Sequence, residues 1–205
     1  MVKLAAPMMS LDASGSLGGA IVFSKWKGRN YARQLVRPAN PKSALQTSMR
    51  AMLRFLSQDW KNIGATPQSS WVNEGAAGNF SPFNAYIQAN QRRWREFLAP
   101  GETDTMLGVG TLPIAALTSA TGGIHHANLL LTLTTLNNCW GVAIFRSPTG
   151  TFTPSLSNCI HVMPFTATTT WTDTPLVAGT YYYDAKFFVK DGFLGPDEGE
   201  VNATV

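Results

Sequence analysis

Three histidines and two cysteines are the side chains best suited to bind a metal ion or to act as nucleophiles: His125, His126, His161, Cys139 and Cys159. Neighbouring residues of a strand point to opposite faces, so His125 and His126, at the start of a predicted strand, are poorly placed to share a metal. A ligand set that combines His161 with the cysteines is the alternative. Two cysteines are too few for a disulfide framework. They could pair across neighbouring predicted strands, but small buried apolar residues are the favoured interpretation.

Acidic residues are sparse, and four of them gather near the C-terminus: Asp191, Asp197, Glu198 and Glu200. Their spacing does not match the Asp-x-Asp-x-Asp-Gly loop that binds calcium, so a solvated turn and edge strand is favoured over a calcium site. The sequence contains no Gly-x-Ser-x-Gly, no His-Glu-x-x-His and no arrangement of paired carboxylates. We therefore predict that the protein is not an enzyme and uses no metal or cofactor.

Basic and aromatic side chains of the first hundred residues are the candidates for binding a partner. Residues 1–100 carry 13 Lys or Arg and 4 Asp or Glu, whereas residues 101–205 carry 3 and 8, so the halves have net charges of +9 and −5. Such a chain either contacts an acidic partner or stacks head to tail with copies of itself. Nucleic acid ranks below a protein partner because the cations form no compact run. The candidate residues are Lys25, Trp26, Lys27, Arg29, Tyr31, Arg33, Arg50, Arg54, Arg92, Arg93 and Arg95.

A β-hairpin is predicted to position the first of these residues. Its arms are residues 20–26 and 31–36, and a turn with Gly28 and Asn30 joins them. Residues 1–19 precede it as an arm, which either extends over a neighbouring subunit or is a disordered terminus. This start of the chain resembles a signal peptide poorly, and the sequence has no stretch of 18 apolar residues, so no membrane association is expected.

Three helices are predicted after the hairpin, each with a capping residue followed by proline: Asn40–Pro41, Thr66–Pro67 and Ser81–Pro82. An apolar stripe marks the first helix at Leu45, Met49, Met52, Leu53, Leu56, Trp60 and Ile63. The second is predicted to break at residues 75–78. We expect Trp60, Trp71 and Trp94, one on each helix, to meet in a small core. Hairpin and helices together form a predicted domain over residues 20–100.

Residues 101–110 are predicted to be a linker, because glycines flank a short polar run. Beyond it the apolar period changes from helical to strand-like. Residues 181, 183, 185, 187 and 189 share one face, and turn signals recur every 10 to 15 residues. About seven strands fit between 112 and 205, which predicts a β-sandwich over residues 111–205. The expected fold class is thus an α+β N-terminal part followed by an all-β sandwich.

The C-terminal half resembles the last third of a fibronectin type III domain, over Leu176–Phe187 (LVAGTYYYDAKF) and Asp191–Gly195 (DGFLG). The resemblance covers roughly residues 110–205 and implies a fibronectin type III or immunoglobulin-like sandwich. It also implies a tyrosine corner, for which Tyr181 or Tyr183 would be the counterpart. It implies little about activity, because such domains mostly bind or space.

The N-terminal half is similar to uncharacterised proteins of tailed bacteriophages and prophages. The similar residues are 19–33 (GAIVFSKWKGRNYAR), 37–46 (RPANPKSALQ), Arg50 and 83–87 (FNAYI), within a span of about residues 20–98. This similarity implies a virion structural protein without a fixed position in the particle. No catalytic residue is implied.

Together these patterns predict a phage structural protein, located in the virion and assembled in the host cytoplasm. The leading role is a capsid decoration (cement) or tail-surface protein. Its basic N-terminal half would bind the major capsid or tail protein and copies of itself, and its sandwich would project outward. The alternative is a host-binding adhesion module whose loops contact a receptor or glycan. A nucleic-acid-binding protein, based on the +9 half, is a third reading.

Overall fold

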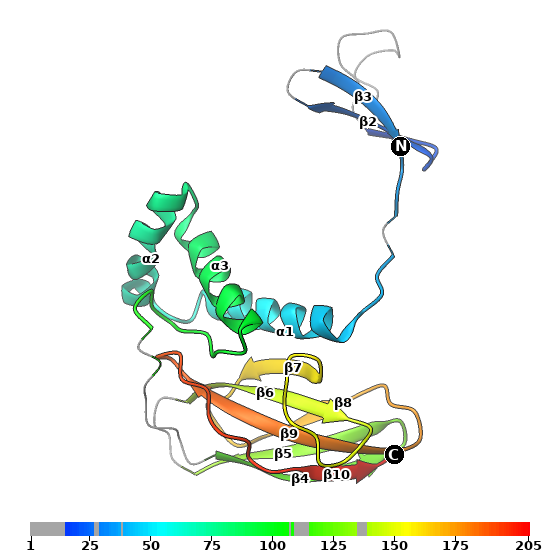
Figure 1. Ribbon diagram of the computed structural model, residues 1–205, viewed down its shortest axis with the longest axis vertical. Coiled ribbons are helices and arrows are strands. Elements are labelled where there is room, and N and C mark those ends of the chain that lie inside the picture. The colour runs from blue at the N-terminus through cyan, green and yellow to red at the C-terminus, as the bar shows by residue number, and fades with distance from the viewer. Residues whose placement is uncertain (1–14, 27–28, 38, 107, 109–114, 135–138) are drawn as a thin grey trace. The chain divides into compact units, whose positions relative to one another are not determined.

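The computed structural model describes residues 15–26, 29–37, 39–106, 108, 115–134 and 139–205, with the backbone alone at 17, 25, 26, 29 and 30. The chain divides into two compact units, residues 1–41 and residues 42–205. We call them the N-terminal unit and the body. Figure 1 follows the chain from one to the other. The described part contains no helix long and apolar enough to span a membrane.

The N-terminal unit contains the predicted hairpin. Strands β2 (Ile21–Trp26) and β3 (Arg29–Gln34) pair antiparallel, with Phe23 opposite Ala32. A short strand β1 (Gly15–Leu17) adds to the other side of β2. The hairpin prediction is therefore confirmed. The predicted arm over residues 1–19 ends in a strand, and its first fourteen residues lie outside the described part.

The body contains the predicted sandwich of seven strands. One antiparallel sheet has the order β4-β5-β8 and the other β10-β9-β6-β7. Their inner faces share a core that includes Leu129, Leu131, Ile144 and Phe187. The strands are β4 (Ala115–Gly123), β5 (His126–Leu133), β6 (Cys139–Ser147), β7 (Cys159–Pro164), β8 (Thr169–Asp173), β9 (Thr180–Val189) and β10 (Val201–Thr204).

A hydrogen bond from a tyrosine hydroxyl closes the loop before β9, as the resemblance to fibronectin type III domains implied. The Tyr181 hydroxyl donates to the carbonyl of Val177 at 3.0 Å, four residues upstream, which is the geometry of a tyrosine corner. Tyr183 instead donates to Asp173 Oδ2 at 3.0 Å. Tyr181 is therefore the counterpart of the corner tyrosine.

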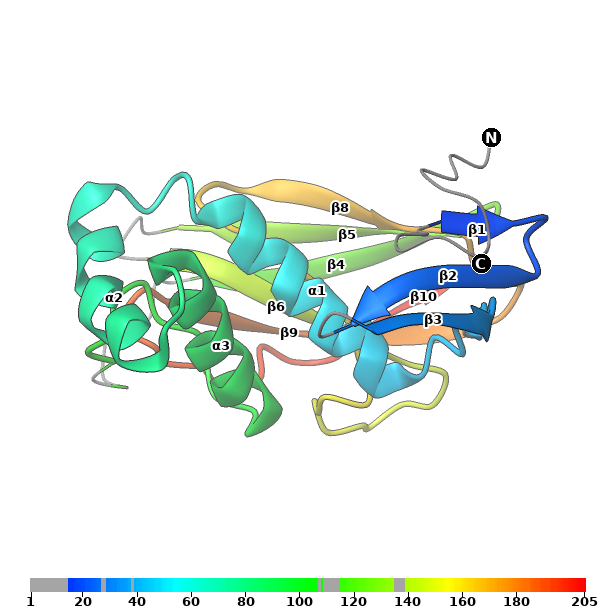
Figure 2. The ribbon, with the colours of Figure 1, turned by 90° about the horizontal axis from the view of Figure 1, so that it is seen from above.

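Three helices lie on the outer side of the four-stranded sheet: α1 (Ala44–Asp59), α2 (Ala65–Gly78) and α3 (Pro82–Arg95). Helix α1 crosses the sheet and packs on β7, whereas α2 packs on α3 beside the end of the sheet (Figure 2). Phe97, just after α3, reaches Phe145 of the sheet with ring centroids 5.9 Å apart. Phe55 of α1 packs edge-on against Trp140 at 5.1 Å and against Phe188 at 5.4 Å between ring centroids. Helices and sheet thus share a second core that contains the predicted tryptophans. Trp71 and Trp94 are buried in it, and Trp60 packs against it through Phe83 and Tyr86.

This shared core changes the predicted domain boundaries. The sequence suggested separate domains over residues 20–100 and 111–205, whereas the compact unit begins at residue 42 and includes the helices. The physical reason lies in β6, which is apolar on both faces, and in Phe188 on the outer face of β9. Phe145 and Phe188 point away from the sandwich core and are fully buried under the helices. A sheet that is apolar on both faces needs a cover on both.

The predicted linker is tied to the body at its start. Asn90 of α3 exchanges two hydrogen bonds with the backbone of Gly101, at 2.7 and 3.0 Å. The Trp71 indole donates to the carbonyl of Glu102, whose carboxylate pairs with Lys190 at 2.8 Å. Residues 101 and 102 are buried, so this stretch acts as a strap between α2, α3 and β9. We call residues 99–106 the strap.

Two of the three helices do not begin at the capping residue that the sequence predicted. Helix α3 begins as predicted, with the Ser81 hydroxyl accepting from the Asn84 amide at 3.2 Å. Helix α1 begins later, with Ser43 as its cap, and α2 begins after Gly64, which has φ 83° and no side-chain cap. Helix α2 also continues through residues 75–78, where a break was predicted. Pro41 and Pro67 therefore do not mark the helix starts that their positions predicted.

The buried face of α1 is also rotated from the predicted stripe. Ser48, Met52, Phe55, Leu56 and Asp59 are buried. Leu45 and Leu53 of the predicted stripe are 56% and 43% exposed. Two polar residues take part because the sandwich and α3 supply partners for them: Trp140 donates to Asp59 at 2.6 Å and Trp94 to Ser48 at 3.0 Å.

Candidate partner-binding surface

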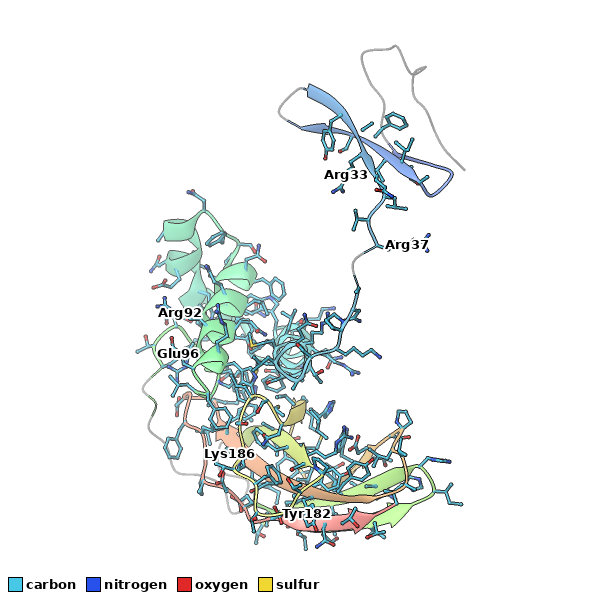
Figure 3. The ribbon with its side chains drawn as sticks, turned by 45° about the vertical axis from the view of Figure 1, so that its right-hand side comes forward. Arg33, Arg37, Arg92, Glu96, Tyr182 and Lys186 are labelled. Atoms are coloured by element: carbon cyan, nitrogen blue, oxygen red, sulfur yellow. The ribbon has the colours of Figure 1, made fainter. Side chains whose placement is uncertain are left out.

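The N-terminal sheet holds most of the candidate residues of the hairpin. Lys25 pairs with Asn30 and Trp26 with Arg29 at the turn end of the ladder, where only the backbone is described. Lys27 lies outside the described residues. Tyr31 and Arg33, two positions apart on β3, lie on the same face of the strand and are both exposed. Figure 3 shows Arg33 with Arg37 after it.

This unit is strongly basic compared with the body. Residues 1–41 carry six Lys or Arg and one Asp, a net charge of +5, and residues 42–205 carry ten and eleven, a net charge of −1. The net positive charge of the chain is therefore carried by this unit, although residues 42–100 add a further net charge of +4. A basic unit attached to a nearly neutral body is suited to an acidic partner.

The same unit leaves apolar side chains in contact with water. Ile21 is 42% exposed, Tyr31 41% and Val36 71%. Within its described residues the unit has one three-stranded sheet and no second layer of helices or strands. A small sheet needs such a layer to bury a face and to be stable. The described part of the unit does not contain such a layer.

Arg50 and Arg54 lie on the exposed side of α1. Arg54 is close enough to His161 of β7 to influence it: burial lowers the pKa of His161 first, and the positive charge of Arg54 lowers it further. The His161 ring stacks on Trp171 of β8 with centroids 4.9 Å apart. His161 thus contributes a ring contact between the two sheets.

The three arginines at the end of α3 separate into two roles. Arg93 is half-buried, and its guanidinium donates to the carbonyl of Ala99 at 2.8 Å and to that of Gly192 at 2.9 Å. It therefore holds the strap and the turn after β9. Arg92 and Arg95 are exposed and remain candidates for a partner (Figure 3 labels Arg92).

Arg92 borders a groove of about 640 Å³ between α2, α3 and the strap. Phe80 and Met106 line it together with the acidic residues Glu74 and Asp104. Its lining therefore carries charges of both signs. The groove therefore does not select a class of ligand by itself.

The residues with catalytic or metal-binding potential are dispersed. Within the described part, no group of three or more His, Cys, Asp or Glu could hold a metal. Cys139 and Cys159 are free and buried, as favoured, and burial raises the pKa of both thiols to about 12. Such thiols stay protonated near neutral pH and are poor nucleophiles. Among the C-terminal acids, Asp197 pairs with Lys186 at 2.6 Å and Glu200 accepts from the Phe152 amide at 3.3 Å.

Three solved structures that resemble this chain each cover about half of it. No family model matches the sequence, and no curated protein matches it. A fibronectin type III-like protein from Clostridium thermocellum is 20% identical, with a TM-score of 0.36 over 46% of this chain and 94% of that one. A β-1,2-glucanase from Parabacteroides distasonis is 18% identical, with a TM-score of 0.36 over 47% of this chain and 14% of that one. The PKD domain of an M14-like peptidase from Thermoplasmatales archaeon SCGC AB-540-F20 is 18% identical, with a TM-score of 0.29 over 47% and 98%.

These similarities are too weak to carry an argument about function. The sandwich stands on its own strand order, with three strands facing four, and the predicted fold class is confirmed by it. None of the three matches tests the similarity of residues 20–98 to tailed-phage proteins, which stays a prediction.

Sequence reasoning missed one surface that the structure brings together. The outer face of the β4-β5-β8 sheet is formed by uncharged side chains from three separate segments. The signal was present in the sequence as a long gap between charged residues.

Proposed function

We propose that this chain is a structural protein of a bacteriophage particle, a capsid decoration or cement protein or an equivalent protein of the tail surface. In this proposal the N-terminal unit anchors the chain to a neighbouring virion protein and the body projects outward. The protein acts by binding, and its place is the virion, assembled in the host cytoplasm.

The observation that carries the proposal is the incomplete N-terminal sheet. Its apolar side chains are exposed, and within the described residues β1 and β3 each pair with β2 alone. The outer edges of these strands offer rows of backbone donors and acceptors. A neighbouring protein could complete the sheet by adding a strand to an edge or a layer to a face. The +5 charge of the unit favours an acidic neighbour.

The similarity of residues 20–98 to tailed-phage proteins supports the choice of a virion as that neighbour. The pattern begins in the N-terminal sheet and continues into the helices of the body. Because the helices and the sandwich share one core, the body can be displayed on the particle surface as a single domain. This leaves residues 1–41 as the anchor, a smaller region than the first hundred residues that the sequence suggested.

Charge reversal separates the anchor from the body. The double variant Arg33→Glu, Arg37→Glu should lose incorporation into particles, measured as copy number per purified particle by quantitative mass spectrometry. The matched double variant Arg92→Glu, Arg95→Glu makes the same charge change at two partner candidates of the body. Because the proposal confines the anchor to residues 1–41, this variant should be incorporated like the unchanged protein. Normal incorporation of the first variant, or absence of the unchanged chain from particles, would overturn the proposal. DNA binding by the chain that weakens steeply with salt would assign the N-terminal unit to nucleic acid instead.

A further inference from the structure

The body is nearly neutral as a whole, but its charges are unevenly divided. Residues 42–100, which contain the helices, hold seven Lys or Arg and three Asp or Glu, a net charge of +4. Residues 101–205, which contain the sandwich, hold three and eight, a net charge of −5. Two surfaces of opposite sign account for much of this difference.

The first surface is the exposed side of α1. Arg50 and Arg54, four residues apart, lie on the same side of the helix, and Lys61 follows just beyond its end. All three are exposed, and Leu53 beside them is 43% exposed. Asp59, the acidic residue of α1, is buried, so the exposed side of this helix has no carboxylate. We call Arg50, Leu53, Arg54 and Lys61 the basic face.

The second surface is the segment that joins β9 to β10. Residues 191–200 contain Asp191, Asp197, Glu198 and Glu200 and no Lys or Arg. Glu198 is half-buried and the other three are exposed. Asp197 pairs with Lys186 at 2.6 Å, whereas no ion pair among the described residues includes the other three carboxylates. We call these four acidic residues the acidic edge.

The fold places the two surfaces at opposite ends of the four-stranded sheet, whose order is β10-β9-β6-β7. Helix α1 packs on β7 at one end of this order. At the other end, the amides of Gly195 and Glu198 donate to the carbonyls of Phe187 and Ala185, and the segment then continues into β10. It therefore lies on the side of β9 away from β6. Figure 1 shows α1 and β10 at opposite sides of the body.

We propose that the basic face of one copy of this chain binds the acidic edge of the next copy. Opposite charges across an interface speed association and select the partner. Both surfaces are fixed to one sheet, so no segment has to become ordered on binding. All of these residues belong to the body, so the inference does not rest on the proposed anchor.

The opposite placement of the two surfaces determines how copies assemble. One copy cannot make both contacts with the same neighbour, because its basic face and its acidic edge point in opposite directions. Each bound pair therefore still presents one basic face and one acidic edge to further copies. A head-to-tail contact of this kind repeats into a ring or a filament.

The charges argue against other occupants of these surfaces. Two basic faces repel each other, as do two acidic edges, so neither surface suits a two-fold dimer. Nucleic acid or a different acidic protein would match the basic face alone. A second copy of the chain matches both surfaces at once.

The contact is expected to be weak between separate molecules and sensitive to salt. Exposed ion pairs each contribute little. The screening length falls from about 10 Å at 0.1 M salt to about 3 Å at 1 M. Self-association should therefore be measurable at high protein concentration and low salt, and about tenfold or more weaker at 1 M. Copies held side by side on a larger assembly would strengthen the contact through their high local concentration.

Charge reversal followed by mixing tests the pairing in the full chain, with sedimentation velocity at low salt as the readout. Arg54→Glu, Lys61→Glu makes the basic face acidic, and Glu198→Lys, Glu200→Lys makes the acidic edge basic. Each variant alone should remain monomeric where the unchanged chain associates, because its two surfaces then have the same sign. An equimolar mixture should associate again, because each variant supplies the charge that the other has lost. Thermal unfolding checks the variants, and Asp191→Lys, Glu200→Lys replaces the second one should it unfold.

A matched pair of variants separates the contact from an effect of net charge. Arg54→Gln, Lys61→Gln and Thr170→Glu, Thr172→Glu change the net charge of the chain equally. The first pair lies in the basic face, whereas the second lies on exposed positions of β8. Only the first should weaken self-association, by about tenfold or more.

Three results would overturn the proposal: an unchanged chain that stays monomeric at low salt, reversal variants that do not associate on mixing, or matched variants that behave alike. Loss of self-association in Arg33→Glu, Arg37→Glu but not in Arg54→Glu, Lys61→Glu would overturn it in favour of the N-terminal unit as the partner of the acidic edge. The experiment contains no particle, so its failure leaves the proposed function untouched.

Discussion

Buried polar side chains at the boundary between the helices and the four-stranded sheet join the two parts of the body. Asp59, at the last turn of α1, accepts a hydrogen bond from the Trp140 indole at 2.6 Å. Arg93, at the last turn of α3, holds the carbonyls of Ala99 and Gly192. An apolar core alone would not fix the orientation of the helices on the sheet, and the hydrogen bonds of these two residues do so because they are directional. Each supports a prediction about stability.

Asp59 makes the stability of the body depend on pH. Burial raises the pKa of this carboxyl above its usual 3.8, and the Trp140 bond opposes this only in part. The folded state therefore holds the proton more tightly than the unfolded chain, and stability falls as pH rises from 3.8 through the raised pKa. Asp59→Asn keeps an acceptor for Trp140 and should reduce this fall, measured by urea unfolding at pH 4, 5 and 7.

Comparison of variants isolates this effect, because Asp184 and Glu198 also have raised pKa values. Asp59→Ala leaves the Trp140 N–H without its acceptor and should lower the unfolding free energy by about 1–3 kcal/mol. An unchanged pH profile in Asp59→Asn would show that Asp59 does not titrate in the folded state over this range.

Arg93 should matter for folding, while its neighbour should not. Arg93→Ala removes two hydrogen bonds from a charged donor, and we expect a loss of about 2–4 kcal/mol in unfolding free energy. Arg92→Ala, in the same turn of α3 but exposed, should stay within about 0.5 kcal/mol of the unchanged protein. Equal urea midpoints for the two variants would contradict the structural role of Arg93.

At the scale of elements, the three helix starts show that local sequence predicts some helix caps and not others. Ser81→Ala removes an observed cap and should cost about 1 kcal/mol. Gly64→Ala places a side chain at φ 83° and should cost about 1 kcal/mol or more. Thr66→Ala should stay within about 0.5 kcal/mol, although its position before proline predicted a cap. Thermal unfolding of the three variants checks the order, and a large loss for Thr66→Ala would favour the sequence-based start.

The hairpin, the three helices and the seven strands could be predicted because each carries a local periodic signal. Which face of each element is buried could not, since that depends on distant partners. The predicted stripe on α1 included Leu45 and Leu53, which remain exposed, and omitted Asp59, which is buried only because Trp140 meets it. The uninterrupted apolar run CWGVAIF in β6 did indicate a strand buried on both faces, because such strands do not alternate between apolar and polar residues.

The candidate partner residues were predictable by type but not by role. Exposed cations on the hairpin follow from composition and strand pattern. Arg93 looks identical to Arg92 and Arg95 in the sequence, and only the fold places the carbonyl of Gly192, 99 positions further along the chain, beside it. The gap in charge between Asp104 and Asp184 was visible in the sequence, but the order β4-β5-β8 was needed to join its three strands into one sheet.

At the scale of the whole molecule, the division at residue 41 means that the body should fold without the N-terminal unit. The boundary is open to protease: Arg37, Lys42 and Ser43 are all exposed. Trypsin cleaves poorly before proline, which protects the Arg37–Pro38 bond and leaves Lys42–Ser43 as the expected site. Limited digestion should therefore release a resistant fragment that begins at Ser43, identified by its mass.

The melting temperature of that fragment then tests the two-unit division directly. Because its helices and sandwich share one core, we expect it to stay within roughly 2 °C of the intact chain. The same fragment should fail to incorporate into particles, since it lacks the proposed anchor. A fragment that melts much earlier would mean that residues 1–41 stabilise the body, and the anchor would then be part of the fold. A stable fragment that still incorporates would move the anchor to the helices or the sandwich.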